Sequence, residues 1–400
     1  MSDCTIRRNT FYEDPAHDYL GLGPSGNRYF RRHQLECKRC VRWLVEGNVF
    51  NGGWPAANQG ATIALTPRAG QAAETAMVSD FDFRYNQILW SPQPFLITGH
   101  NDYSAFQNKA TNRVRIAHNV IYGTGRASDG STQGWPKGNY FNGQVMDMGL
   151  GIQNLAIQNN VIASVSSACC DANLMSFAGD WCGFPNSRLL LENNIYTSLA
   201  ASNTGWWGVR GCGASLSGSA AFDGLWVSGA GTSYTARGNA WQSMLNGTFS
   251  DGTVYPSGNY RSETVSNFTA GLYQWFNDPG SIRPKASGVF ASGSPTARGA
   301  NGADAGPDWV AFDAAKGDLR NLRVLSIATT TANIHYTAPD TTACTVEYGT
   351  SSTALTGTRV TDTPAGSRFR AVSLSGLSGA TTYYVRVYCA RMLSTSFVTQ

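Results

Sequence analysis

A short pattern of alternating hydrophobic and polar residues, closed by an asparagine, recurs along most of the chain. It is clearest at residues 113–122, RVRIAHNVIY, where alternating apolar residues lead into Asn119 and an apolar pair follows. The same pattern surrounds Asn9, Asn48, Asn86, Asn160, Asn194 and Asn239. The distance along the chain between successive asparagines is shortest from Asn86 to Asn119 and longest from Asn194 to Asn239. A unit that repeats on this scale indicates a solenoid.

The residues around each asparagine predict strands rather than helices. Alternation with a period of two is typical of β-strands, whereas a helical repeat needs apolar residues at i, i+3, i+4 and i+7. Asparagine suits a turn because its side chain hydrogen-bonds local backbone and it tolerates the left-handed conformation. Asparagines at the same corner of every coil could also hydrogen-bond along the stack, which would satisfy their polar groups near the core.

A second strand-like stretch lies between successive asparagine patterns. Such stretches stand at residues 61–68, 95–100, 144–149, 174–180 and 206–210. We therefore expect at least two strands in each coil, joined by loops rich in Gly, Ser and Asn.

These features together resemble the right-handed parallel β-helix of pectate-lyase-like proteins, over roughly residues 1 to 313. The resemblance implies an all-β fold in which residues 1–315 form a right-handed parallel β-helix. The stretch 293–308 is similar to the irregular last coil that closes many such helices, so Trp309 to Phe312 would pack over the end. Because the chain opens inside a repeat, we expect upstream coils, a cap and a secretion signal in a longer parent.

From Leu319 the sequence changes to short Thr- and Ser-rich strands without the corner asparagine. Such strands, closely spaced over the remaining residues, suit a small sandwich. Residues 377–387, LSGATTYYVRV, resemble the corner and penultimate strand of a fibronectin type III domain. The resemblance implies such a domain at residues 319–400. In that fold Cys344 and Cys389 would lie on neighbouring strands, where a disulfide could form.

Charge and hydropathy narrow the class of partner. Only 14% of residues are charged, the net charge is +4, and most of the 30 basic residues are Arg. No basic run is present, so we expect no nucleic-acid partner. No stretch approaches the ~20 apolar residues of a membrane span, and no signal peptide precedes the first repeat. Nothing in the sequence determines the oligomeric state.

Cysteine usage favours an oxidising compartment, because the chain has nine cysteines. Cys37 and Cys40 form a single Cys-x-x-Cys, which is half of a zinc site, so we expect buried thiols or a bridge and no metal. Cys182 and Cys212 follow equivalent strands of successive coils, which would bring them within bridging reach. We therefore expect a secreted or cell-surface protein. The whole sequence is similar to secreted bacterial β-helix proteins followed by fibronectin-like domains, and this resemblance implies a bacterial source.

Polar residues at the ends of the second strands would form a row once the coils stack. The row consists of Arg68, His100, Asp102, Asp147, Asp180 and Arg210. Paired carboxylates of inverting glycosidases stand roughly 6.5–9.5 Å apart, and residues one or two coils apart would meet that spacing, since each coil advances ~4.8 Å. On this hypothesis Asp147 and Asp180 are acid and base, and His100 tunes or shuttles a proton. Arg68, Arg210 and Asp102 would bind substrate.

The same residues have a structural explanation. A stacked Asp180 beside Arg210 can be a surface ion pair of little energetic value, and a carboxylate in a turn commonly caps backbone amides. Asp80 and Asp82 alternate with phenylalanines, which indicates the solvated side of one strand.

Aromatic residues support a sugar ligand. Trp181, Trp206 and Trp207 lie in or beside loops, where a ring face can stack on the C–H surface of a sugar, although packing under a loop is their commoner fate. Scarce Lys together with abundant Trp favours a neutral or weakly acidic glycan.

We therefore expect an extracellular polysaccharide-acting protein, with a polysaccharide as substrate. A glycoside hydrolase using carboxylates on the helix face is the first hypothesis, and it needs no cofactor. A polysaccharide lyase is the second; it would use His100 or Arg68 as base, and Ca²⁺ could take part. The third is a glycan-binding or adhesion protein without catalysis. The motifs that mark pectate lyases and polygalacturonases are absent, so the resemblance implies no catalytic residue.

Overall fold

The structure is a computed structural model of residues 1–400. It describes residues 2–12, 33–52, 61–68, 76–89, 91, 93–99, 111–124, 146–148, 151–164, 175–177, 186–198, 209–211, 216–217, 227–228, 231–232, 234–241, 259–261, 306–308, 311–312, 315, 320–338, 342–353, 355, 359–362, 369–389 and 392–400. The chain divides into two compact units, residues 1–269 with 284–316 and residues 270–283 with 317–400.

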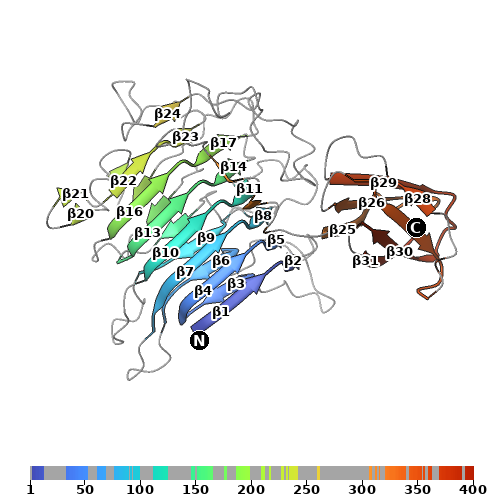
Figure 1. The fold of residues 1–400 in the computed structure, drawn as a ribbon, viewed down its shortest axis with the longest axis horizontal. Coiled ribbons are helices and arrows are strands. Elements are labelled where there is room, and N and C mark those ends of the chain that lie inside the picture. The colour runs from blue at the N-terminus through green and yellow to red at the C-terminus, as the bar shows by residue number, and fades with distance from the viewer. Residues whose placement is uncertain are drawn as a thin grey trace. The chain divides into compact units, whose positions relative to one another are not determined.

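The asparagine patterns build two parallel sheets of the first unit, one on each side of the asparagine. The first sheet contains, in order, β1 (Ser2–Arg7), β4 (Cys40–Glu46), β7 (Val78–Arg84), β10 (Asn112–Ala117), β13 (Gln153–Gln158), β16 (Ser187–Glu192) and β22 (Tyr234–Arg237). The second sheet contains β2 (Thr10–Tyr12), β5 (Val49–Asn51), β8 (Gln87–Leu89), β11 (Val120–Thr124), β14 (Val161–Ser164), β17 (Ile195–Ser198), β23 (Ala240–Trp241) and β24 (Tyr260–Arg261). Figure 1 shows the coils rising from β1, in blue, to β24.

The second strand-like stretches form the third sheet. Its strands are β3 (Leu35–Cys37), β6 (Ile63–Leu65), β9 (Phe95–Ile97), β12 (Met146–Met148), β15 (Met175–Phe177), β18 (Val209–Gly211) and the antiparallel β19 (Leu216–Ser217). A short antiparallel pair, β20 (Val227–Ser228) and β21 (Gly231–Thr232), lies outside these sheets. Each full coil therefore contributes one strand to each of three sheets.

The inward residues of the three sheets pack into one core along the stack. Phe50, Phe83 and Phe95 are fully buried there. Phe83 and Phe95 meet edge to face at 5.5 Å between ring centroids, and Phe11 stacks on Phe50 at 4.7 Å. A buried phenylalanine contributes about 1.5–3 kcal/mol over an exposed one, so this column of rings fixes the coils to one another.

The second unit is a two-layer antiparallel sandwich. One layer contains β25 (Arg320–Leu325), β26 (Thr331–Thr337) and β29 (Phe369–Ser375); the other contains β28 (Arg359–Thr361), β27 (Thr345–Gly349), β30 (Thr382–Tyr388) and β31 (Met392–Val398). The Tyr383 hydroxyl accepts a hydrogen bond from the Ser378 amide at 2.9 Å, which is the tyrosine corner of such sandwiches. The predicted Cys344–Cys389 disulfide is confirmed, with the Cα atoms 4.6 Å apart.

These sheets confirm the predicted fold class, a parallel β-helix followed by a β-sandwich. Cys37 and Cys40 form a disulfide bridge, which was one of the two alternatives expected for this pair. The proposed Cys182–Cys212 pair lies outside the described residues. Among the described residues no helix is long and apolar enough to span a membrane.

The stretch expected to pack over the end of the helix, Trp309 to Phe312, lies only partly within the described residues. The described residues 306–308, 311–312 and 315 run back along the side of the helix, and we call them the strap. Its Gly306 amide donates to the Asn193 carbonyl at 2.7 Å, and its Ala315 carbonyl accepts from Arg8 Nε at 3.1 Å. Because Asn193 and Arg8 belong to distant coils, the strap spans most of the stack.

Candidate functional site

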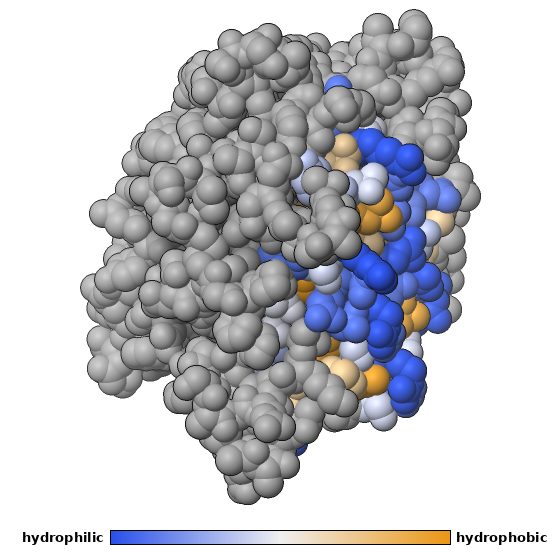
Figure 2. Space-filling model, turned by 90° about the vertical axis from the view of Figure 1, so that its left-hand side faces the viewer, coloured by the Kyte–Doolittle hydropathy of each residue, from blue (hydrophilic) through white to orange (hydrophobic). Residues whose placement is uncertain are grey.

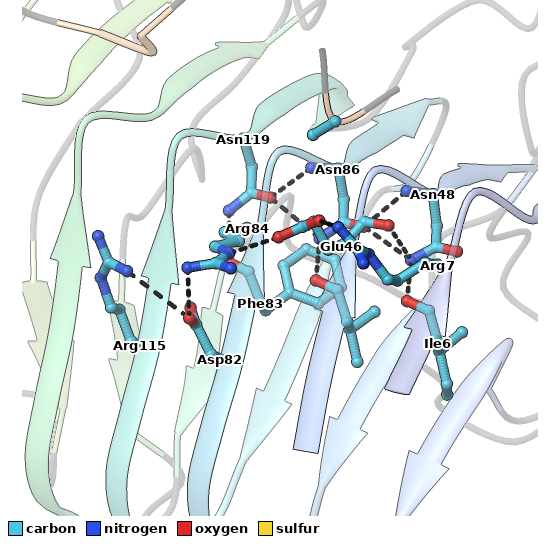
Figure 3. Close-up of polar contacts among 12 residues, drawn as sticks. Ile6, Arg7, Glu46, Asn48, Asp82, Phe83, Arg84, Asn86, Arg115 and Asn119 are labelled. Carbon is cyan, nitrogen blue, oxygen red and sulfur yellow. Dashed lines mark hydrogen bonds and ion pairs between the residues drawn. The ribbon is translucent and has the colours of Figure 1, made fainter. Parts of the chain in front are cut away.

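The corner asparagines form a continuous hydrogen-bonded ladder, as predicted. Its members are Asn9, Asn48, Asn86, Asn119, Asn160, Asn194, Asn239 and Asn259. Asn119 illustrates the geometry: its Oδ1 accepts from the backbone amide of Asn86 at 2.8 Å, and its Nδ2 donates to the Phe83 carbonyl at 2.9 Å (Figure 3). The ladder satisfies buried backbone groups at the corner, so its role is structural.

The residue before each ladder asparagine adopts the left-handed conformation. These residues are Arg8, Gly47, Tyr85, His118, Asn159, Asn193 and Gly238. Only two of them are glycine, although the left-handed region costs other residues roughly 1–2 kcal/mol. The repeated ladder bonds hold the backbone in this conformation.

A second left-handed column lies near the start of the first-sheet strands. It consists of Asp3, Arg42, Asp80, Arg113, Asn154 and Arg188, and we call it the bulge column. One residue is skipped in both partner strands at this position, without a shift of register, so the left-handed residues of successive coils are aligned. Arg42 NH2 donates to Asp3 at 2.7 Å and Arg113 NH2 to Asp80 at 2.8 Å. Sequence analysis missed this column, and the expectation that Asp80 is only solvated was incomplete.

The outer face of the first sheet carries a charged network. Glu46 accepts hydrogen bonds from Arg7 and from Arg84 Nε, the latter at 2.7 Å, while Asp82 lies 3.3 Å from Arg84 and 3.6 Å from Arg115 (Figure 3). Burial opposes ionisation of Glu46, but the two arginine hydrogen bonds outweigh it and lower its pKa. Burial raises the pKa of Asp82, against the attraction of Arg115 and Arg84.

Two carboxyl groups whose pKa values shift in opposite directions can mark an acid and a base. Here both Glu46 oxygens accept from arginines, and the side chain is 6% exposed. A carboxylate held in this way cannot activate a water, so we assign Glu46 and Asp82 to the stability of the first sheet.

The outer face of the second sheet is covered. Its outward residues Val49, Val120, Val161 and Ile195 are fully buried although they lie outside the inner core. The strap supplies part of this cover, since a Cβ on Gly306 would approach the Ile195 side chain to 2.9 Å. Substrate therefore has no access to this face at β5, β11, β14 and β17, whereas Thr10 and Tyr12 of β2 are exposed.

The strap is held at the corner by a histidine. His118 stacks on Tyr85 at 5.1 Å, and its Nδ1 accepts the Asp308 amide at 3.1 Å. Burial lowers the pKa of His118 to about 4, with help from Arg115 and against the attraction of Asp308. The neutral ring is therefore the form that holds the strap.

The third sheet aligns part of the predicted row. The pairing register puts Asp147 opposite Leu96 on one side and Ser176 on the other, and Ser176 opposite Arg210. Asp147 and Arg210 therefore share one row, two strands apart, or roughly 10 Å. In this register Ser176 stands beside Asp147, where the hypothesis expected Asp180. We call Asp147, Ser176 and Arg210 the third-sheet row.

Of the remaining predicted residues the structure describes only Arg68, which lies outside this row. Arg68 is half-buried three residues beyond β6, and its amide donates to the Lys38 carbonyl at 3.3 Å. His100, Asp102, Asp180, Trp181, Trp206 and Trp207 lie outside the described residues. The roles assigned to these residues stay predictions.

Close backbone contact marks the chain just before His100. A Cβ on Gly99 would lie 2.1 Å from the Gly151 carbonyl carbon and 2.3 Å from the Ile152 amide nitrogen. Only glycine fits there, so the coil that enters residue 100 is fixed against the coil that follows β12.

Metal ligands do not gather in the part of the chain that the structure describes: no group of three or more His, Cys, Asp or Glu residues is close enough to hold an ion. The chemistry argued below rests on the chain's own residues.

Comparison with known proteins adds no functional assignment. No protein-family profile matches the chain, and no curated protein matches it. Seven chains of solved structures match, among them a computationally redesigned β-sandwich protein. It is 23% identical, with a TM-score of 0.18, and the match covers 20% of this chain and 93% of that one. A similarity of this size bears on no part of the function.

Proposed function

We propose that the protein acts on polysaccharide outside the cell as a glycoside hydrolase, with its site on the outer side of the third sheet. The observation that carries the proposal is the register that aligns Asp147 with Arg210. This register places an aspartate and an arginine in one row along the stack, two strands apart, which suits a chain-like ligand. A guanidinium binds hydroxyl or carboxylate oxygens in a bidentate way.

The other two sheets are weaker candidates. The second sheet is covered along its outward residues, and the first sheet holds its most buried carboxylate, Glu46, between two arginines. Among the described strands, those of the third sheet place Asp147 and Arg210 in one row, and neither residue has been assigned a structural role.

In the proposed mechanism Asp147 is one of two carboxylates that protonate the leaving oxygen and activate water. Asp180 is the proposed partner. It follows β15 by three residues, so the pair reaches the ~6.5–9.5 Å of inverting hydrolases only if the chain turns back towards the row after Phe177. Arg210 would orient the sugar beside them.

The family assignment belongs to the same proposal. We infer kinship with pectate-lyase-like β-helix proteins for the first unit and with fibronectin type III domains for the second. The stacked asparagines, three parallel sheets and tyrosine corner support it.

A panel of neutral and uronic-acid glycans tests the reaction. A hydrolase releases reducing ends, whereas a lyase gives an unsaturated product that absorbs in the ultraviolet and would refute hydrolysis. We expect Asp147→Asn and Asp180→Asn each to lower kcat by at least about 100-fold. If both variants keep their activity, the proposed site is refuted. If the protein is retarded in glycan gels but forms neither product, it binds glycan without cleaving it.

A further inference from the structure

Charge divides unevenly along the outer side of the first sheet. Strands β1, β4 and β7 carry three arginines and four acids, whereas β10, β13, β16 and β22 carry four arginines and one acid, Glu192. Glu192 is already paired with Arg237 at 2.7 Å. Figure 2 shows that the described residues on this side of the molecule are mostly hydrophilic, with a few hydrophobic ones between them.

The bulge column shows what its arginines bind. Arg42 and Arg113 each hold an aspartate of the neighbouring coil through both Nε and NH2. This is the bidentate pairing that guanidinium makes with carboxylate. The same backbone position therefore presents a guanidinium in a geometry suited to a carboxylate.

Arg188 occupies this position without a carboxylate. Its neighbour in the column is Asn154, whose amide donates to Asn112 at 2.7 Å. Arg188 is exposed and has no ion pair with any residue in the described parts of the chain. The column thus alternates Asp–Arg–Asp–Arg and then places Arg188 beside Asn154 instead of an aspartate.

Arg115 is the second weakly paired arginine on this half of the sheet. It lies 3.6 Å from Asp82, beyond hydrogen-bond distance, and its side chain is 41% exposed. Ala156 and Leu190 follow Arg115 in the register, and both are half-buried. β10 and β16 are two strands apart, roughly 10 Å. The guanidinium groups of Arg115 and Arg188 therefore flank a small apolar surface formed by Ala156 and Leu190.

We propose that Arg115, Asn154, Ala156, Arg188 and Leu190 form a binding strip for a polysaccharide that bears uronic-acid carboxylates. Arg188 takes a carboxylate in the manner of Arg113, Arg115 takes a second, and the C–H face of a sugar rests on Ala156 and Leu190. This inference relies on the proposed function for the class of ligand, but it concerns binding on a different sheet and requires no cleavage.

The charge pattern favours a glycan over a nucleic acid. Asp80 and Asp82 on β7 lie beside the strip, and Glu46 on β4 and Asp3 on β1 lie beyond them. They would repel a duplex, whose phosphates lie ~1.7 Å apart along the axis. A glycan with spaced carboxylates can bind the arginines and avoid these acids.

Affinity electrophoresis in gels containing polygalacturonate, heparin, dextran or duplex DNA tests the strip. We expect retardation by polygalacturonate and by heparin, which both bear uronic-acid carboxylates, none by dextran or DNA, and a decrease of the retardation with salt. Arg188→Gln should weaken polygalacturonate binding about fivefold, as for an exposed ion pair, and Arg188→Gln with Arg115→Gln should abolish retardation.

Arg42→Gln is the matched control, because Arg42 occupies the same column and backbone conformation but already has its aspartate. Its binding should be unchanged. The inference is overturned if wild-type protein ignores polygalacturonate, if DNA binds as well, or if Arg42→Gln weakens binding as much as Arg188→Gln. A wild-type protein that binds polygalacturonate through Arg188 but cleaves no glycan would refute the hydrolase and leave the strip intact.

Discussion

At the scale of single residues, the asparagine ladder shows why one side chain can determine a corner. Asn119 is fully buried, and its amide group bonds donors and acceptors on both neighbouring coils. Asn9, at the first coil, is exposed and bonds to one neighbouring coil only. Ladder asparagines therefore contribute different amounts to the free energy of unfolding, depending on their position along the stack.

Asn119→Ala should lower the free energy of unfolding by about 2–5 kcal/mol, because it leaves the Asn86 amide and the Phe83 carbonyl buried without partners. Asn9→Ala is the control and should cost less than about 1 kcal/mol. Urea unfolding of both variants checks this, and equal costs would contradict a cooperative ladder.

The sandwich contains a buried ion pair of a different kind. Asp362 and Arg370 lie 2.9 Å apart, and both side chains are 2% exposed. Asp362 also accepts from the Tyr336 hydroxyl at 2.5 Å and the Cys344 amide at 2.6 Å. These contacts tie the two layers of the sandwich together next to the disulfide.

Asp362→Ala should destabilise the second unit by about 3–5 kcal/mol, because it strands a buried guanidinium. The double variant Asp362→Leu with Arg370→Met removes both charges and should recover most of that loss. Thermal unfolding of the second unit is the measurement. A double variant no more stable than the single one would show that the charge is not the cause.

At the scale of elements, the strap is the part of the first unit that depends on pH. The pKa of His118 falls from 6.5 to about 4 on folding. Between these values the unfolded chain binds a proton that the folded chain does not, so stability decreases as the pH falls from about 6.5 to 4. Protonation of Nδ1 also removes the acceptor of the Asp308 amide.

His118→Phe keeps the ring stack on Tyr85 and removes the titration. We expect the wild-type protein to lose up to about 3 kcal/mol between pH 6.5 and 4 from this group, and the variant to show a shallower pH dependence. Unfolding midpoints across this range measure the effect. Parallel curves for both proteins would exclude His118 as the titrating group.

The elements were predictable to different degrees. The alternation around Asn86, Asn119 and Asn160 was enough to predict both flanking strands, because buried and exposed positions alternate in a strand. The bulge column was not predicted, since aspartate and arginine in the left-handed conformation leave no periodic signal. The course of the strap was not predicted either, because it depends on which outer face needs cover.

The candidate site was predicted only in part. The sequence analysis chose Asp147 and Arg210, which share a row, but it expected Asp180 where the register has Ser176. Unequal loops between the coils shift positions that look equivalent in the sequence. A strand register is fixed by backbone hydrogen bonds, so residue counts along loops of different length cannot supply it.

At the scale of the whole chain, the first unit turns distant sequence positions into neighbours. Its three sheets differ in their outer faces. Ion pairs stabilise the first sheet, and the outward residues of the second are buried from β5 to β17. The register of the third sheet places Asp147 and Arg210 in one row. The central claim is that glycan is processed along the third-sheet row.

Hydrogen–deuterium exchange of the whole chain with a bound oligosaccharide, taken from the glycan that is cleaved fastest, tests this claim most directly. We predict slower exchange in peptides that contain β12, β15 and β18, and loss of that protection in Arg210→Gln. Peptides of β5 and β8, under the covered face, should be unchanged. Protection confined to other sheets, with none at residues 146–148, 175–177 or 209–211, would contradict the account.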